Sequence, residues 1–273
     1  MKDIQLSYLY EEFKNLFKKI TGCTPSDNKK IVLKRIQRFM DKRKLSLSDL
    51  SLLENRIKQN NEFADKFFEI FIPRESYFFR EKEYLTLITE TLIPKIKKQP
   101  INILSAPCSG GEEVYSLKIL LKEKNSHNQT VIKGIDISKS AIETAKKKKY
   151  GKNSLKSLPV SIKSKYFLKT EEDRFSLKSE LADNTEFQRE NIMNIREKEV
   201  YDIILCRNFL IYFDRDTRER VLKKLHGALK ENGFLIVGET ELSLIKNKVL
   251  FKKCVKNKLV FYQKVGYGKT ADC

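Results

Sequence analysis

The residues best suited to chemistry are the glycines and acids of one segment, Cys108-Ser109-Gly110-Gly111-Glu112-Glu113. Paired glycines let the backbone pass close to a ligand. Carboxylates at the start of a helix would repel a pyrophosphate, which binds to free N–H groups there. They suit a ligand with a cationic amino group and hydroxyls, such as S-adenosylmethionine. The alternative reading is that Glu112 and Glu113 only complement the helix dipole.

Two strands and a helix must position these groups. The apolar run 101–105 is followed directly by turn residues, which predicts a buried strand. Apolar residues then recur at helical spacing over 114–121, and a second strand ends at Asp136. An acid at that place accepts hydrogen bonds from ribose hydroxyls. It could instead cap the following helix, although Ser138 is better placed to do so. The order of elements predicts a nucleotide-binding βαβ unit.

Length and composition indicate a globular protein. The chain has 273 residues, 40% of them hydrophobic and 33% charged, enough for one large domain or two modest ones. No apolar run approaches the roughly 18 residues of a membrane span, and the first residues lack the apolar block of a signal peptide. The five cysteines show no CxxC spacing. We therefore expect a cytoplasmic protein with reduced thiols and without a bound metal.

The net charge of +19 suits nucleic acid, an anionic membrane or an acidic protein, and does not choose among them. Residues 1–73 show helical periodicity only, and the second predicted helix is strongly basic. Its side chains at every fourth position form one ridge, which we call the basic ridge: Lys30, Lys34, Arg38 and Lys42. The ridge is either a solvated face or a docking surface for an acidic partner.

Four motifs in register give the chain a specific resemblance. They are SYFFRE at 76–81, CSGGEEVYSL at 108–117, GIDIS at 134–138 and ILCRNFLIYF at 204–213. In this order the chain resembles the bacterial chemotaxis receptor glutamate methyltransferases (CheR-type) over essentially its whole length. The resemblance implies an α/β fold, a Rossmann-like class I methyltransferase sheet with a small all-helical N-terminal domain and an inserted antiparallel β subdomain.

The expected boundaries follow from the same resemblance. We expect a helical receptor-docking domain at 1–73, a linker and first helix at 74–97, and the methyltransferase domain at 98–273. The inserted β subdomain is expected at about 155–190, because short β-like segments including Thr185-Glu186-Phe187 alternate there with charged turns.

The resemblance also implies the cofactor and the residues that hold it. The cofactor is S-adenosylmethionine, released as S-adenosylhomocysteine, and no metal is required. The positions carried over as cofactor-binding are Arg74, Ser76, Arg80, Glu113, Asp136, Asn191, Ile192, Cys206, Arg207 and the adjacent Asn208. Arg74 departs from the small polar residue usual at its place, and Gly110-Gly111 departs from the usual Thr-Gly pair.

A glutamate substrate makes the chemistry simple. Its carboxylate, with a reference pKa of about 4.3, is already ionised at neutral pH, so no general base is needed. Catalysis then consists of placing a carboxylate oxygen in line with the sulfonium methyl group, with water excluded. We assign Arg80 to orient that carboxylate and Tyr212 to line the cleft. For Arg80, the alternative is an ion pair with Glu112, Glu113 or the carboxylate of the cofactor. For Tyr212, the alternative is a position in the core with its hydroxyl group hydrogen-bonded.

The expected partner is the acidic cytoplasmic helical bundle of chemoreceptors, which the basic ridge would contact. The protein is expected to be a monomer that reaches the membrane only through receptors and does not bind nucleic acid. In the family that the chain resembles, members that bind a C-terminal tethering peptide of the receptor have a longer, glycine-rich loop in the inserted subdomain. The corresponding loop here, Lys169–Phe175, is short and contains no glycine. The resemblance therefore implies independence from such a peptide. The competing functions are a nucleic-acid methyltransferase, which the charge suggests, and a non-catalytic adaptor that binds the cofactor.

Overall fold

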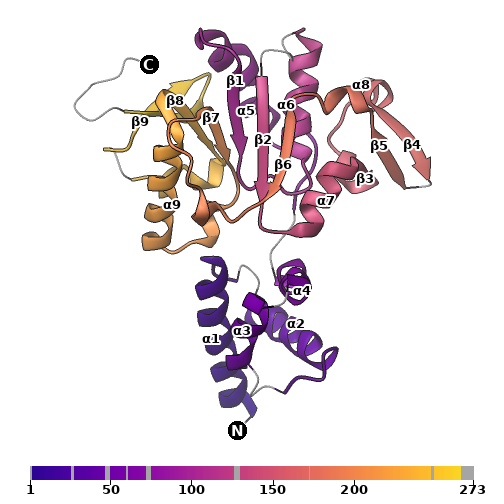
Figure 1. Cartoon of the computed structure of the whole chain (residues 1–273), viewed down its shortest axis with the longest axis vertical. Helices are drawn as coiled ribbons and strands as arrows, with labels where there is room; N and C mark the ends of the chain where they lie inside the picture. Colours follow the sequence, from indigo (N-terminus) through magenta and orange to yellow (C-terminus); the bar gives the residue numbers. More distant parts are fainter. Residues whose placement is uncertain are drawn as a thin grey trace. The chain divides into compact units, whose positions relative to one another are not determined.

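The computed structural model describes residues 2–25, 28–46, 50–59, 61–71, 75–125, 130–171, 173–246 and 249–265 (Figure 1). The chain divides into two compact units. The first comprises Met1–Arg74 and Tyr212–Arg218, and the second comprises Glu75–Ile211 and Glu219–Cys273. No helix in the described ranges is both long enough and apolar enough to cross a membrane.

The described part of the first unit is helical, with α1 (Lys2–Thr21), α2 (Lys29–Asp41), α3 (Leu50–Gln59) and α4 (Asn61–Phe71). Helical spacing of apolar residues brings phenyl rings into one core, with neighbouring centroids between 4.6 and 6.4 Å apart. These rings belong to Phe13, Phe17, Phe39, Phe67 and Phe71. The side chain of Asn28 caps α2 by accepting a hydrogen bond from Lys30 N at 2.9 Å.

The segment Tyr212–Arg218 joins the first unit although it lies far along the chain. Both the amide and the hydroxyl of Thr24 donate to the Tyr212 carbonyl, at 2.6 and 3.0 Å. Lys18 forms an ion pair with Asp214. The sequence motif that contains Tyr212 gives no sign of these contacts, because the partners are almost two hundred residues away.

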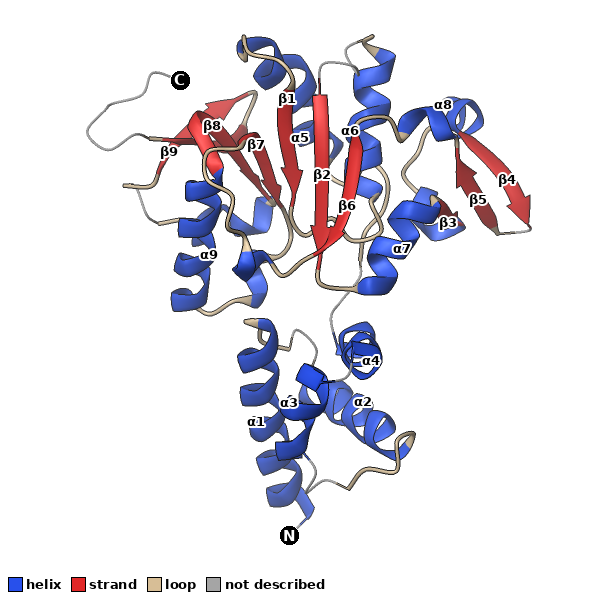
Figure 2. Cartoon of the chain, in the orientation of Figure 1, coloured by secondary structure: helices blue, strands red, loops and turns tan. Residues whose placement is uncertain are grey.

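The second unit contains a seven-stranded sheet in the order β6-β2-β1-β7-β8-β10-β9. Its strands are β1 (Ile101–Ser105), β2 (Thr130–Asp136), β6 (Thr185–Arg189), β7 (Tyr201–Cys206), β8 (Leu229–Val237), β9 (Phe251–Lys256) and β10 (Leu259–Lys264). Strands β6, β2, β1, β7 and β8 are parallel, and β10 pairs antiparallel with β8 and β9. Figure 2 shows the central strands side by side. This arrangement confirms the predicted Rossmann-like methyltransferase fold.

The strands are apolar because both faces of the sheet are covered. Every residue of β7 is buried, as are four of the five in β1. The helices of the second unit are α5 (Lys82–Leu87), α6 (Glu112–Glu123), α7 (Lys139–Lys147), α8 (Val160–Tyr166) and α9 (Arg215–Ala228), whose first turn belongs to the first unit. The α5 helix continues as a π-helical turn, Ile88–Leu92, and a 3₁₀ turn, Ile93–Lys95.

The inserted subdomain differs from the prediction at both ends. Its antiparallel sheet contains β3 (Lys149–Gly151), β5 (Arg174–Leu177) and β4 (Phe167–Glu171), in that spatial order. The segment predicted to close it, Thr185-Glu186-Phe187, instead opens β6 and pairs parallel with β2 in the main sheet. Phe187 is buried there, 5.4 Å from the Tyr115 ring centroid. Alternation of apolar residues identifies a strand but not its partner, so the boundary at about 155–190 is wrong.

The cysteines only partly match the expectation. Cys23, Cys108 and Cys206 are free and buried. Cys254 is disulfide-bonded, so the expectation of reduced thiols throughout is wrong at this residue.

We predict that Phe67→Ala destabilises the protein by about 3–5 kcal/mol, because the ring is fully buried among other phenyl rings and its loss leaves a cavity. The measurement is urea-induced unfolding followed by far-ultraviolet circular dichroism. The control is Tyr8→Ala on α1, where the side chain is 69% exposed and the effect should be within about 0.5 kcal/mol. Equal effects of the two changes would contradict the phenyl core.

Candidate functional site

The predicted site residues of the second unit gather at the carboxyl ends of its parallel strands. Ser105 ends β1, Asp136 ends β2 and Cys206 ends β7, and the three strands are direct neighbours in register. In open parallel sheets, ligands bind outside this edge. The topology therefore brings together the glycine turn, Asp136 and the segment that follows β7.

The glycine turn is shaped by contacts that leave no room for other residues. Gly111 precedes α6 in the left-handed conformation, with φ of +86°. A Cβ atom there would lie 2.9 Å from Ala145 Cβ and 3.2 Å from the Phe187 ring. The Tyr150 hydroxyl donates to the Gly110 carbonyl at 2.9 Å. Packing against Ala145 and Phe187, together with the positive φ, therefore requires glycine at position 111.

Asp136 links two loops at the end of β2. One carboxylate oxygen accepts from Ser109 N at 2.9 Å and the other from Ser138 N at 2.8 Å. A carboxylate oxygen can accept more than one hydrogen bond, so an acid at this position is chemically suited to ribose hydroxyls. The side chain of Ser138 caps α7 through Ala141 N, as the sequence predicts.

The two glutamates of the turn have different environments. Glu113 accepts from the Ser105 hydroxyl at 2.8 Å and pairs with Arg207. Glu112 is 5% exposed, and its Oε1 accepts a hydrogen bond from Ser154 Oγ at 3.4 Å. Burial raises the pKa of Glu112 against the opposing effect of the nearby Ser76 hydroxyl. Consecutive helical residues point about 100° apart, which separates them. Neither side chain is a solvated acid that only complements the helix dipole.

Arg207 is the centre of the polar interactions at this edge, and its side chain is only 3% exposed. Nη1 donates to Glu113 Oε2 at 2.8 Å. Nη2 donates to the Arg80 carbonyl at 2.8 Å and to Glu81 Oε2 at 3.0 Å. Burial acts to lower the pKa of Arg207, but the two carboxylates outweigh it and raise the pKa. The guanidinium is therefore held as a charged clamp between three chain segments.

Glu81, which the sequence analysis did not single out, completes this cluster. Its Oε1 accepts from the Asn208 side-chain amide at 3.0 Å. Burial acts to raise the pKa of Glu81, but the charge of Arg207 and the bond from Asn208 more than offset it and lower the pKa. The only sequence signal was its place at the end of the SYFFRE motif.

A second unpredicted acid, Glu241, fixes the segment after β7. It lies in the 3₁₀ turn Glu239–Leu244 and is fully buried. Its carboxylate accepts four backbone N–H bonds, from Asn208 at 2.8 Å, Gly238 at 2.7 Å, Phe209 at 2.6 Å and Leu210. Backbone amides that a strand end leaves open are thereby satisfied.

Arg80 is half-buried, and among the described residues its guanidinium contacts Glu75 and Tyr77. Its Nη1 donates to the Glu75 carbonyl, and its guanidinium carbon lies 5.8 Å from the Tyr77 ring centroid. The arginine that pairs with Glu113 is Arg207. Because a guanidinium has five N–H donors, Arg80 retains most of its bonding capacity within the described part of the chain.

The remaining predicted positions lie as follows. A cavity of about 480 Å³ adjoins the ends of β2 and β6 and is lined by Ile137, Gln188, Arg189, Glu190, Asn191, Asn194 and Arg196. Ile192, which follows Asn191 in the sequence, is buried, and Cys206 is fully buried. Tyr212 belongs to the first unit, and Arg74 lies outside the described residues. The roles of these residues stay predictions.

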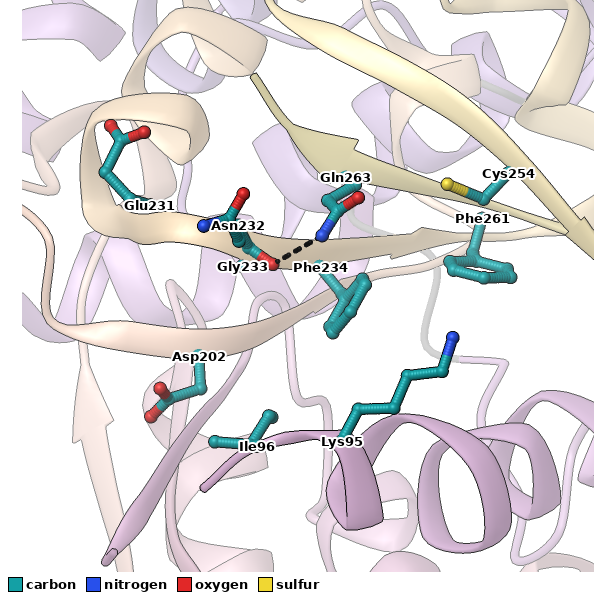
Figure 3. A pocket seen from close by; sticks show the side chains of 10 residues that line it. All are labelled: Lys95, Ile96, Asp202, Glu231, Asn232, Gly233, Phe234, Cys254, Phe261 and Gln263. Carbon is teal, nitrogen blue, oxygen red and sulfur yellow. Dashed lines mark hydrogen bonds between the residues drawn. The ribbon is translucent and has the colours of Figure 1, made fainter. Parts of the chain in front are cut away.

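A second cavity, of about 260 Å³, lies near the start of β7, where Asp202 is the second residue (Figure 3). Its walls include Lys95, Phe234 and Phe261, and Gln263 Nε2 donates to the Asn232 carbonyl at 3.1 Å. None of the predicted site residues lines it. Because Asp202 and Arg207 flank opposite ends of β7, this cavity is separate from the candidate site.

The residues at the carboxyl edge fit S-adenosylmethionine. Asp136 places a carboxylate, an acceptor suited to ribose hydroxyls, at the end of β2, and the cavity lined by Asn191 offers space next to that strand. In the described ranges, no group of three or more His, Cys, Asp or Glu side chains is arranged to hold a metal ion.

Comparison with known proteins gives a consistent result. The family model "CheR methyltransferase, SAM binding domain" matches residues 74–260. A chemotaxis protein methyltransferase of Campylobacter jejuni is 32% identical over 256 residues, which cover 93% of this chain and 95% of the relative. One from Borreliella burgdorferi is 32% identical and covers 61% of this chain and 63% of its own. Chemotaxis protein methyltransferase 2 of Vibrio cholerae is 28% identical, with 95% and 94% covered.

We predict that Arg207→Met lowers the free energy of unfolding by about 3–5 kcal/mol, because Glu81 and Glu113 lose their shared cation. Adding Glu113→Gln should recover part of this loss by removing one uncompensated charge. The measurement is urea-induced unfolding, with the exposed Arg174→Met as control. An Arg207→Met variant as stable as the control would contradict the buried cluster.

Proposed function

This chain belongs to the CheR methyltransferase family, and on that basis we propose that it methylates glutamate side chains of chemoreceptors. The product would be a glutamate methyl ester. The observation that carries the proposal is the carboxyl edge of the sheet, where Asp136 and the glycine turn lie next to the Arg207 cluster and the Arg80 backbone. The printed names of the relatives, chemotaxis protein methyltransferases, support the class of substrate.

The cofactor supplies the methyl group and is released as S-adenosylhomocysteine. In the proposed site, Asp136 would hold the ribose, Asn191 and Ile192 would hold the adenine, and the backbone at Cys206-Arg207 would complete the binding site. Glu113 provides negative charge at the start of α6, attractive to an amino group even after pairing with Arg207. These assignments agree with the chemistry of the donors present.

The residues of the chain place the substrate and do not take a proton from it. A glutamate with a pKa of about 4.3 reaches the site as a carboxylate, so its oxygen can attack directly. Arg80, most of whose N–H donors have no partner among the described residues, can orient the two carboxylate oxygens. The role assigned to Tyr212 from the sequence stays a prediction.

We predict that the purified protein transfers labelled methyl groups from S-adenosylmethionine to receptor-bearing membranes and that the label is released by base. Base-lability identifies methyl esters, as expected for a carboxylate acceptor. Arg80→Ala should reduce the rate on the order of a hundredfold, since poor alignment of the reacting groups has that cost. Label on DNA instead would support a nucleic-acid methyltransferase, and cofactor binding without turnover would support an adaptor.

We also propose the basic ridge on α2 as the receptor contact. Its four side chains are exposed, while Val32, Ile36, Phe39 and Met40 on the other face are buried. Long-range attraction between a positive ridge and an acidic helical bundle raises the rate of encounter.

We propose that the protein acts as a cytoplasmic monomer and reaches the membrane through its receptors. The short connection between β4 and β5 favours independence from a tethering peptide.

We predict that combining Lys34→Glu with Arg38→Glu lowers the receptor methylation rate about tenfold at low salt, because association loses electrostatic steering. The affinity for S-adenosylhomocysteine, measured by calorimetry, should stay unchanged. The matched control combines Arg56→Glu with Lys66→Glu, which makes the same charge change at exposed positions of α3 and α4. Equal rates for the two double variants would rule out the ridge as the docking surface.

A further inference from the structure

We propose that Glu81 is a positioning residue of the methyl-transfer site, which holds Arg80 in place through Arg207 and Asn208. The inference rests on the proposed function, since it concerns the orientation of the substrate by Arg80. Glu81 does not itself contact the reacting atoms in this proposal. It acts by fixing the backbone on which the Arg80 side chain is mounted.

The backbone around Arg80 adopts a conformation that requires external support. Phe79 has φ of +60° and Glu81 has φ of +47°, both in the left-handed region that residues with side chains seldom occupy. Such conformations persist where surrounding contacts determine them. Arg80 therefore lies between two residues whose backbone would leave the left-handed conformation if the contacts that hold them were removed.

The contacts that hold this turn lie on both sides of Arg80. On the N-terminal side, Phe79 N donates to Ser116 Oγ at 2.9 Å, and the Phe79 side chain is buried. On the C-terminal side, the support is polar. Arg207 Nη2 donates to the Arg80 carbonyl and to Glu81 Oε2, while the Asn208 amide donates to Glu81 Oε1.

Glu81 is the member of this cluster that can be changed without removing the clamp. Without its charge, Arg207 still has the Glu113 carboxylate at 2.8 Å and the Arg80 carbonyl. The segment after β7 is still held by the four backbone bonds to Glu241. The proposed cofactor contacts at Glu113, Asp136 and Cys206 should therefore survive, whereas the turn that carries Arg80 loses its main polar anchor.

We expect a change of Glu81 to lower kcat. A displacement of about 1 Å at a positioning group can cost roughly a hundredfold in rate. Glu81→Gln keeps the size of the side chain and weakens its charge-assisted bonds. A merely structural role for Glu81 would lower stability, with kcat falling only as folded protein is lost. A positioning role lowers kcat in fully folded protein.

The test compares Glu81→Gln with Glu83→Gln, a matched change at an exposed glutamate of α5. For Glu81→Gln we expect kcat for receptor methylation to fall about 10- to 100-fold, while the dissociation constant for S-adenosylhomocysteine changes less than about threefold. Glu83→Gln should match the wild type in both. Glu81→Asp, which keeps the charge, should restore at least part of kcat, and serves as the informative variant if Glu81→Gln does not fold.

A double-mutant cycle with Arg80→Lys decides whether Glu81 acts through Arg80. We expect Glu81→Gln to slow the Arg80→Lys enzyme by less than about threefold, because the group that it positions is already changed. Full additivity of the two effects would overturn the inference, as would a kcat for Glu81→Gln equal to that of Glu83→Gln. A wild-type protein that forms no methyl esters would instead overturn the proposed function, and the inference with it.

Discussion

The ion pairs of Arg207 are the interaction on which the rest of the second unit's functional edge depends. A guanidinium with a 3% exposed side chain requires anionic partners, and it finds one on α6 and one in the turn before α5. Through them it connects the end of β7, the glycine turn and the Arg80 backbone. The elements that would bind cofactor and substrate are thus joined by one desolvated charge.

The same edge shows how carboxylates organise backbone that the sheet leaves unpaired. Asp136 accepts from the amides of two loops, and Glu241 accepts four amides from the segments after β7 and β8. These acids therefore stabilise the loops after the strands by accepting hydrogen bonds from backbone amides, whether or not a ligand is bound. The carboxylate of Asp136 is fixed in this way at the end of β2 by the amides of Ser109 and Ser138.

The two units divide the chemistry of the chain. The second unit is a methyltransferase of the chemotaxis class, and its site at the sheet edge depends on buried, paired charges. The first unit has an apolar phenyl core and presents an unpaired row of cations on α2 within the described residues. The buried, paired charges of the second unit suit the alignment of reacting groups. The exposed charges of the first unit suit the attraction of an acidic partner.

The sequence by itself determined the local features, because these depend on neighbouring residues. The buried strands, the glycine turn, the Ser138 cap and the basic ridge could all be predicted from spacing and residue type. The four motifs in register also identified the family. Only the tertiary structure decided which strand β6 joins, since Phe187 has the same alternation whether it pairs with β2 or with the inserted sheet. It also decided that Arg207 rather than Arg80 pairs with Glu113, and that Glu81 and Glu241 matter, because those contacts join residues from 32 to 126 positions apart.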